Sequence, residues 1–143
     1  MNAETVFSIA NTTALATWLV LALFQRRRWA TDIVVPVAVS LFAATYIVIV
    51  ASTWLTSSGG FSSLAAVSTL FSHPWVLLAG WLHYLAFDLL VGRWEVRDAE
   101  RRGIKPWVVV PFMALTFMFG PAGWLSYCVL RRLAGHTAAD AAN

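Results

Sequence analysis

The chain has 143 residues, of which 59% are hydrophobic and 12% charged, against about 25% charged residues in soluble domains. This composition predicts one integral membrane domain over residues 1–143, because helices of about 20 apolar residues would use most of the chain. The net charge of +3 is small and the arginines cluster between apolar segments, which fits membrane orientation better than nucleic-acid binding. Cys128 is the only cysteine, which excludes an intramolecular disulfide.

The first half of the chain predicts two membrane spans and a shorter helix. The spans cover about residues 5–24 and 33–55, and a basic segment, Gln25–Arg28, separates them. Residues 61–72 are too few to span a membrane, and their apolar side chains recur at helical spacing. We therefore expect a short amphipathic helix in the membrane interface. A re-entrant segment is the alternative, and it would need protein around it.

The second half predicts two further spans. The third covers about residues 74–92, with Pro74 at the first helical position, and continues as a cytosolic helical extension over residues 93–102. The fourth covers about residues 107–130, and Pro121 is expected to kink it. The predicted fold is an all-α bundle of four transmembrane helices, with the short interfacial helix between spans two and three.

The distribution of basic residues predicts the orientation. Those in the loops after spans one and three are Arg26, Arg27, Arg28, Arg93, Arg97, Arg101, Arg102 and Lys105. They should be cytoplasmic, which places both termini on the non-cytoplasmic side. The Ala- and Arg-rich composition hints at a bacterial inner membrane. Arg131 and Arg132, expected on the opposite side, argue mildly against this orientation.

Two ionisable side chains, His83 and Asp88, lie inside the third span. Such groups are costly in a bilayer, so each is a candidate functional residue. His83 can act as a general acid or base, or form a neutral hydrogen bond between helices. Asp88 can move a proton or hold a substrate, or it can pair with Arg93 or accept a hydrogen bond from Tyr84.

His83 and Asp88 do not form a local pair. Their spacing places them about 140° apart around a helix, so a joint role needs a cavity bordered by other helices. The best candidate for its second wall is the predicted kink, residues 117–124. We expect no metal site and no cofactor, because the histidines are far apart and no second carboxylate comes near.

Two blocks resemble a known family. They are WLHYLAFDLLVGRW, with the charged segment after it, and LTFMFGPAG. They are similar to the small four-span membrane proteins related to the plant abscisic-acid-deficient protein required for neoxanthin synthesis. The resemblance covers about the last 70 residues well, and the first 60 match mainly in hydropathy. Plant members are implicated in converting violaxanthin to neoxanthin, which opens an epoxide and forms an allene.

The resemblance implies a membrane isomerase for a carotenoid or related isoprenoid that works by acid/base chemistry without a redox cofactor. His83 and Asp88 would be the catalytic acid and base. The expected substrate-binding residues are Trp81, Tyr84, Phe87, Arg93, Phe117, Phe119 and Trp124. The alternative is a non-catalytic protein that binds a carotenoid or lipid, or joins an assembly. Expected partners are membrane lipid and an apolar polyene, with homo-oligomerisation left open.

Overall fold

The structure, a computed structural model, describes residues 2–140, and their side chains as far as residue 134. Its regular elements are α1 (Ala3–Leu23), η1 (Ala30–Val34), α2 (Val35–Thr53), α3 (Leu64–Phe71), α4 (Pro74–Arg101), α5 (Pro106–Phe119) and α6 (Pro121–Asp140). In this part of the chain, three helices are long and apolar enough to cross a membrane: α1, η1 with α2, and α4. They coincide with the first three predicted spans, and the all-helical prediction is confirmed.

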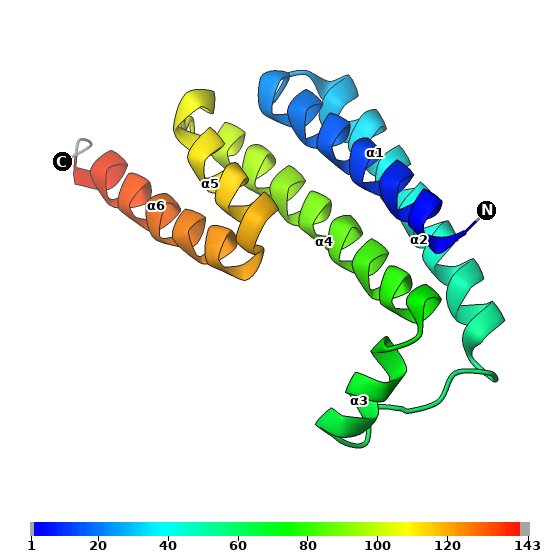
Figure 1. Cartoon of the computed structure of the whole chain (residues 1–143). Helices are drawn as coiled ribbons and strands as arrows, with labels where there is room; N and C mark the ends of the chain where they lie inside the picture. Colours follow the sequence, from blue (N-terminus) through cyan, green and yellow to red (C-terminus); the bar gives the residue numbers. More distant parts are fainter. Residues whose placement is uncertain (1, 141–143) are drawn as a thin grey trace.

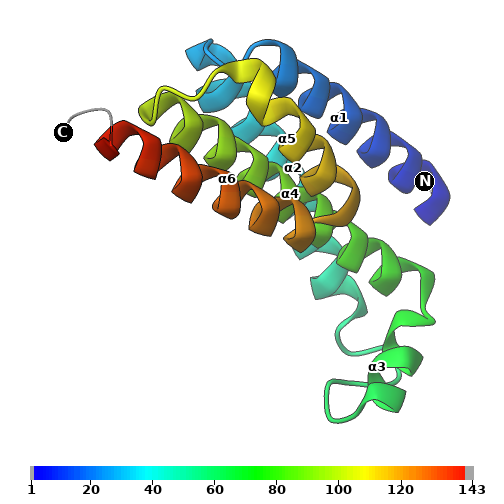
Figure 2. The same ribbon diagram turned by 90° about the vertical axis from the view of Figure 1, so that its left-hand side faces the viewer.

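α4 is the central element of the bundle. It contacts α1, α2, α3, α5 and α6, and Figures 1 and 2 show the other long helices arranged along it. Pro74 begins this helix, because a first-turn proline loses no intrahelical hydrogen bond. The predicted extension is the last part of the same helix, where Arg102 Nε donates to Asp98 Oδ2 at 2.8 Å.

The predicted interfacial helix is present as α3, although its position in the interface stays a prediction. Ser63 caps its first turn by accepting a hydrogen bond from the Ala66 amide at 3.1 Å. Among the long helices, α3 packs mainly against α4, and it projects from one end of the bundle (Figure 1). It therefore covers only the start of α4.

The fourth predicted span, residues 107–130, is not a single kinked helix. α5 ends at Gly120, whose φ of +46° is not helical, and α6 begins at Pro121. The chain reverses there, so that α5 and α6 form a hairpin beside α4 (Figure 1). A Cβ atom at Gly123 would collide with the backbone nitrogen of Thr116, so glycine is needed for this close packing. The sequence correctly located the break but not the reversal.

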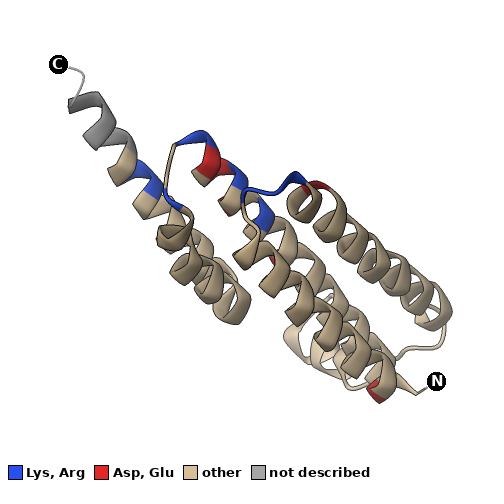
Figure 3. Cartoon of the chain, turned by 90° about the horizontal axis from the view of Figure 1, so that it is seen from above, with Lys and Arg blue, Asp and Glu red and all other residues tan. Residues whose placement is uncertain are grey.

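The reversal also corrects the predicted position of Arg131 and Arg132. Arg131 Nη2 donates to Asp98 Oδ1 at 2.8 Å, and the Tyr127 hydroxyl donates to Asp98 Oδ2 at 2.8 Å. Burial and this hydrogen bond raise the pKa of Tyr127, which keeps its hydroxyl a donor. α6 therefore returns to the end of α4 that carries the other arginines, and Lys and Arg gather at that end in Figure 3.

Candidate functional site

Asp88 lies midway along α4 and faces the turn of the α5–α6 hairpin. Its side chain is buried, with 7% exposure. A Cβ atom at Gly120 would lie 3.2 Å from Oδ1 of Asp88, so the turn sits directly against the carboxyl group. Oδ2 of Asp88 is buried and bonds to no described group. On the same face, the Tyr84 hydroxyl donates to the carbonyl oxygen of Phe117 at 3.3 Å.

Glu95 is a second buried carboxyl group on the same face of α4. Its exposure is 0%. Oε1 accepts a hydrogen bond of 2.7 Å from the Thr116 hydroxyl, and Oε2 is buried with no partner among the described residues. Asp88 and Glu95 are seven positions apart, which is close to two full helical turns. Both therefore face the hairpin.

Trp18 of α1 lies against α4 at Gly92, which stands between Asp88 and Glu95 in the sequence. Its ring lies against Gly92, where any Cβ atom would collide with it, and it packs on Phe117 with ring centroids 5.7 Å apart. Trp18 Nε1 is also buried without a described partner. Asp88, Glu95 and Trp18 thus form what we call the carboxyl cluster, an internal polar site between α1, α4 and the hairpin.

The sequence-based prediction missed Glu95, because it assigned residues 93–102 to a cytosolic extension. The seven-residue spacing from Asp88 was the signal that could have found it. Only the return of α5 along α4, however, buries the carboxyl group under Thr116.

His83 lies on another side of α4, as the angular spacing predicted. It stacks on Phe87, with ring centroids 4.5 Å apart, and its ring lies 5.9 Å from that of Tyr46 on α2. It is exposed rather than enclosed between helices. The structure therefore does not bring His83 and Asp88 together.

His83 lines a groove of about 650 Å³ between α2, α3 and the start of α4. We call it the α2–α4 groove. Its aromatic lining consists of Tyr46, Trp54, Phe61, Phe71 and Trp81. Within the described part of the chain, His83 is the one histidine in this lining, and no Asp, Glu, Lys or Arg accompanies it. Ser57 also lines it, and its hydroxyl oxygen is buried with no described partner.

Trp81 and Phe87 lie on α4 on either side of His83 in the sequence. Trp81 Nε1 donates to Asn11 Oδ1 on α1 at 2.7 Å, and its ring contacts those of Phe7 and Tyr84. The Trp81 indole is therefore held in place at the rim of the groove. Phe87 is exposed beside His83.

Arg93 does not pair with Asp88. Its Nε donates to the backbone oxygen of Thr31 at 2.6 Å, and Nη2 bonds Asp32 Oδ1 at 3.2 Å. Arg97 also pairs with Asp32. These bonds fix α4 to η1, just before α2, so the ion pair between Arg93 and Asp88 is not formed.

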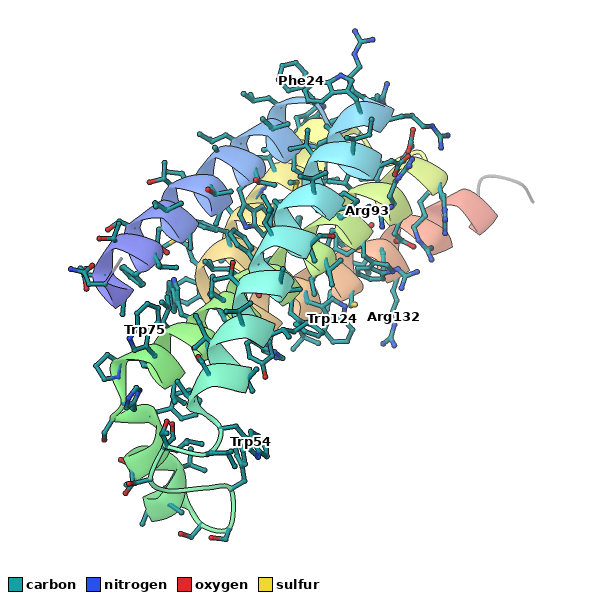
Figure 4. All side chains as sticks on the ribbon, turned by 90° about the vertical axis from the view of Figure 1, so that its right-hand side faces the viewer. Phe24, Trp54, Trp75, Arg93, Trp124 and Arg132 are labelled. Carbon is teal, nitrogen blue, oxygen red and sulfur yellow. The ribbon has the colours of Figure 1, made fainter. Side chains whose placement is uncertain are left out.

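The three predicted binding residues on the hairpin lie in three different surroundings. Phe117 is partly buried against Trp18, whereas Phe119 is exposed. Trp124 lines a different cavity, together with Arg131 and Arg132, on the side shown in Figure 4. The predicted site residues are thus divided among the groove, the carboxyl cluster and the basic end. The described residues also contain no group of three or more His, Cys, Asp or Glu placed to hold a metal ion.

Comparison with known proteins agrees with the resemblance carried by the two motifs. No curated protein and no solved structure matches the chain. Residues 5–127, which include most of α1, all of α2 to α5, both motifs and the hairpin turn, match the family described as ABA DEFICIENT 4-like. The chain therefore belongs to the ABA DEFICIENT 4-like family.

Proposed function

We propose that this protein is a membrane isomerase that acts on a carotenoid or related isoprenoid at the α2–α4 groove. Membership of the family indicates a carotenoid-related membrane protein. The observation that carries the proposal is the groove itself, an apolar and aromatic space of about 650 Å³ with His83 at its wall. Ligand sites are typically apolar concavities with a few placed polar groups.

The substrate that fits this lining is a polyene with a hydroxylated, epoxidised end ring. Flat aromatic walls suit a conjugated chain. The unpartnered Ser57 hydroxyl can bond the ring hydroxyl, because a buried polar group gains most from a partner it otherwise lacks. The groove is bordered by helices that would face lipid, so the rest of a long substrate can remain in the bilayer.

A single imidazole can serve as both the proton donor and the proton acceptor of this reaction. Protonated His83 donates its proton to the epoxide oxygen as the carbon–oxygen bond breaks, which leaves a cation delocalised over the polyene. The neutral imidazole then removes the proton from the adjacent polyene carbon. The electron pair of that bond forms the second double bond of the allene. Product and substrate are isomers, His83 ends as it began, and Phe87, stacked at 4.5 Å, stabilises the imidazolium ion.

The test is to incubate the purified full-length protein with a carotenoid 5,6-epoxide and with the same carotenoid lacking the epoxide. We expect an isomer of unchanged mass only from the epoxide. His83→Gln should lower the rate by at least about 100-fold, as expected for a lost acid/base group. His73→Gln, at the start of α4 and outside the groove lining, should retain activity.

Three results would contradict this assignment. Full activity of His83→Gln would remove His83 from the chemistry. Loss of activity only in Asp88→Asn would move the reaction to the carboxyl cluster. Pigment that co-purifies without any conversion would favour the second candidate, a carotenoid-binding protein. The described lining also supports it, because no Asp, Glu, Lys or Arg accompanies His83 there.

A further inference from the structure

A second cavity lies at the basic end of the molecule, against the outer face of α6. Its volume is about 620 Å³. Its lining residues are Arg102, Trp124, Leu125, Cys128, Val129, Arg131 and Arg132. Three guanidinium groups thus border one end of a surface that is otherwise apolar. Among the residues whose side chains the structure describes, no acidic one lines the cavity, so this lining favours an anion.

Two of the three arginines are held in position by contacts within the protein itself. Asp98 accepts from Arg102 Nε and Arg131 Nη2, each at 2.8 Å. The Arg131 guanidinium also lies 5.1 Å from the ring centre of Trp94. One carboxylate therefore positions two arginines without neutralising all three charges.

Donors remain for a ligand. Arg131 Nε is buried and bonds to no described acceptor. Arg132 makes no ion pair within the described residues, and its side chain extends away from the bundle in Figure 4. A buried guanidinium donor without a partner is unfavourable, and phosphate oxygens match guanidinium geometry.

The other basic cavity at this end is different. Arg93 and Arg97 are satisfied by Asp32 and Glu100, and Asp98 and Glu100 line the space themselves. An anion would meet carboxylates there. The two cavities differ in whether carboxylates line them. Basic residues near a membrane surface therefore do not by themselves produce an anion site like the one on α6.

The apolar part of the cavity identifies the rest of the ligand. Trp124, Leu125, Cys128 and Val129 recur at helical spacing along one face of α6, leading from the arginines toward the hairpin turn over about 12 Å. A headgroup anion alone would leave this surface uncovered, whereas an acyl chain would cover it.

We propose that this cavity binds one anionic phospholipid, with its phosphate on Arg102, Arg131 and Arg132 and an acyl chain along α6. Basic pockets between helices at a membrane surface are suited to such headgroups. The site is separate from the α2–α4 groove and does not depend on the proposed isomerase activity.

The experiment uses the full chain and its only cysteine. A solvent-sensitive fluorophore on Cys128, inside the cavity, reports lipid binding in detergent titrated with phosphatidylglycerol or phosphatidylcholine. We expect saturable binding of phosphatidylglycerol only. Arg132→Gln and Arg102→Gln should each weaken it about five-fold, the effect of one basic residue near an anionic headgroup.

The matched control is Arg26→Gln, which removes an exposed charge outside the cavity and should leave binding unchanged. Equal affinity for the two lipids, or equal weakening by all three variants, would overturn the site. Complete competition by inorganic phosphate at the same concentration would show a simple anion site and would refute the lipid. An unlabelled copy, monitored by co-purified lipid, should show the same order of binding.

Discussion

At the residue scale, Glu95 connects the central helix to the hairpin. Its carboxyl group is fully buried, and its described hydrogen bond comes from Thr116 on α5. A buried polar group costs stability unless it is satisfied. Removing either partner leaves the other without its bond in an apolar interior. The pair therefore specifies how α5 lies on α4.

We predict that Glu95→Ala destabilises the protein by about 2–4 kcal/mol, because it creates a cavity and removes the partner of the Thr116 hydroxyl. Glu95→Gln keeps the shape and an acceptor, so it should cost much less. The measurement is the fraction of solubilised protein that stays monodisperse after heating. Glu100→Ala, an exposed site on the same helix, is the control. Wild-type behaviour of Glu95→Ala would refute this role.

At the element scale, α5 is too short to span a membrane. Its 14 residues extend about 21 Å, against about 30 Å of hydrocarbon. The helix instead ends where Gly120 meets Asp88, and α6 returns along it. Within this hairpin, the absence of a side chain at Gly123 lets α6 pack directly on the backbone of Thr116.

Gly123→Leu should therefore separate α5 from α6 and lower stability by at least about 1–3 kcal/mol, the usual cost of overpacking. Ala122→Leu adds similar bulk at the neighbouring exposed position and should be tolerated. Thermal stability in mild detergent distinguishes them. If both variants behave alike, the close contact of the hairpin does not support the fold.

At the scale of the whole molecule, the arginines and the lysine lie at one end of the bundle (Figure 3). The ion pairs of Asp32 with Arg93 and Arg97, and of Asp98 with Arg131, join η1, α4 and α6 there. The positive-inside rule predicts that this end is cytoplasmic. If three helices span the membrane and the hairpin returns, we predict that the start of α1 and the arginines of α6 lie on opposite sides.

This orientation can be tested in a Cys128→Ser background with single cysteines at Glu4 and Arg132. On intact cells or right-side-out vesicles, a membrane-impermeant maleimide should label position 4 at once and position 132 only after permeabilisation. Four full spans would expose both positions together. Arg26→Cys, in the loop after α1, should be labelled only after permeabilisation in either case and controls for vesicle integrity.

The sequence was enough to predict the helices and some of the chemistry. Apolar runs of span length located α1, α2 and α4, and Pro74 marked the start of α4, because these are local properties of the chain. The angle between His83 and Asp88 was also predictable, since both lie on one regular helix. The family resemblance was also available from the sequence, because it rests on the two motifs, the first of which contains His83 and Asp88.

Only the tertiary structure decided what those residues face. A proline that follows a glycine, as Pro121 does, is compatible with either a kink or a reversal of the chain. The reversal occurs here because α6 packs on Thr116 of α5 and bonds to Asp98 of α4. That choice buries Glu95 and places Arg131 at the basic end. The local sequence determines the helical period and hence which residues share a face. What each face contacts depends on segments that are distant in the sequence, and the helical period does not encode those contacts.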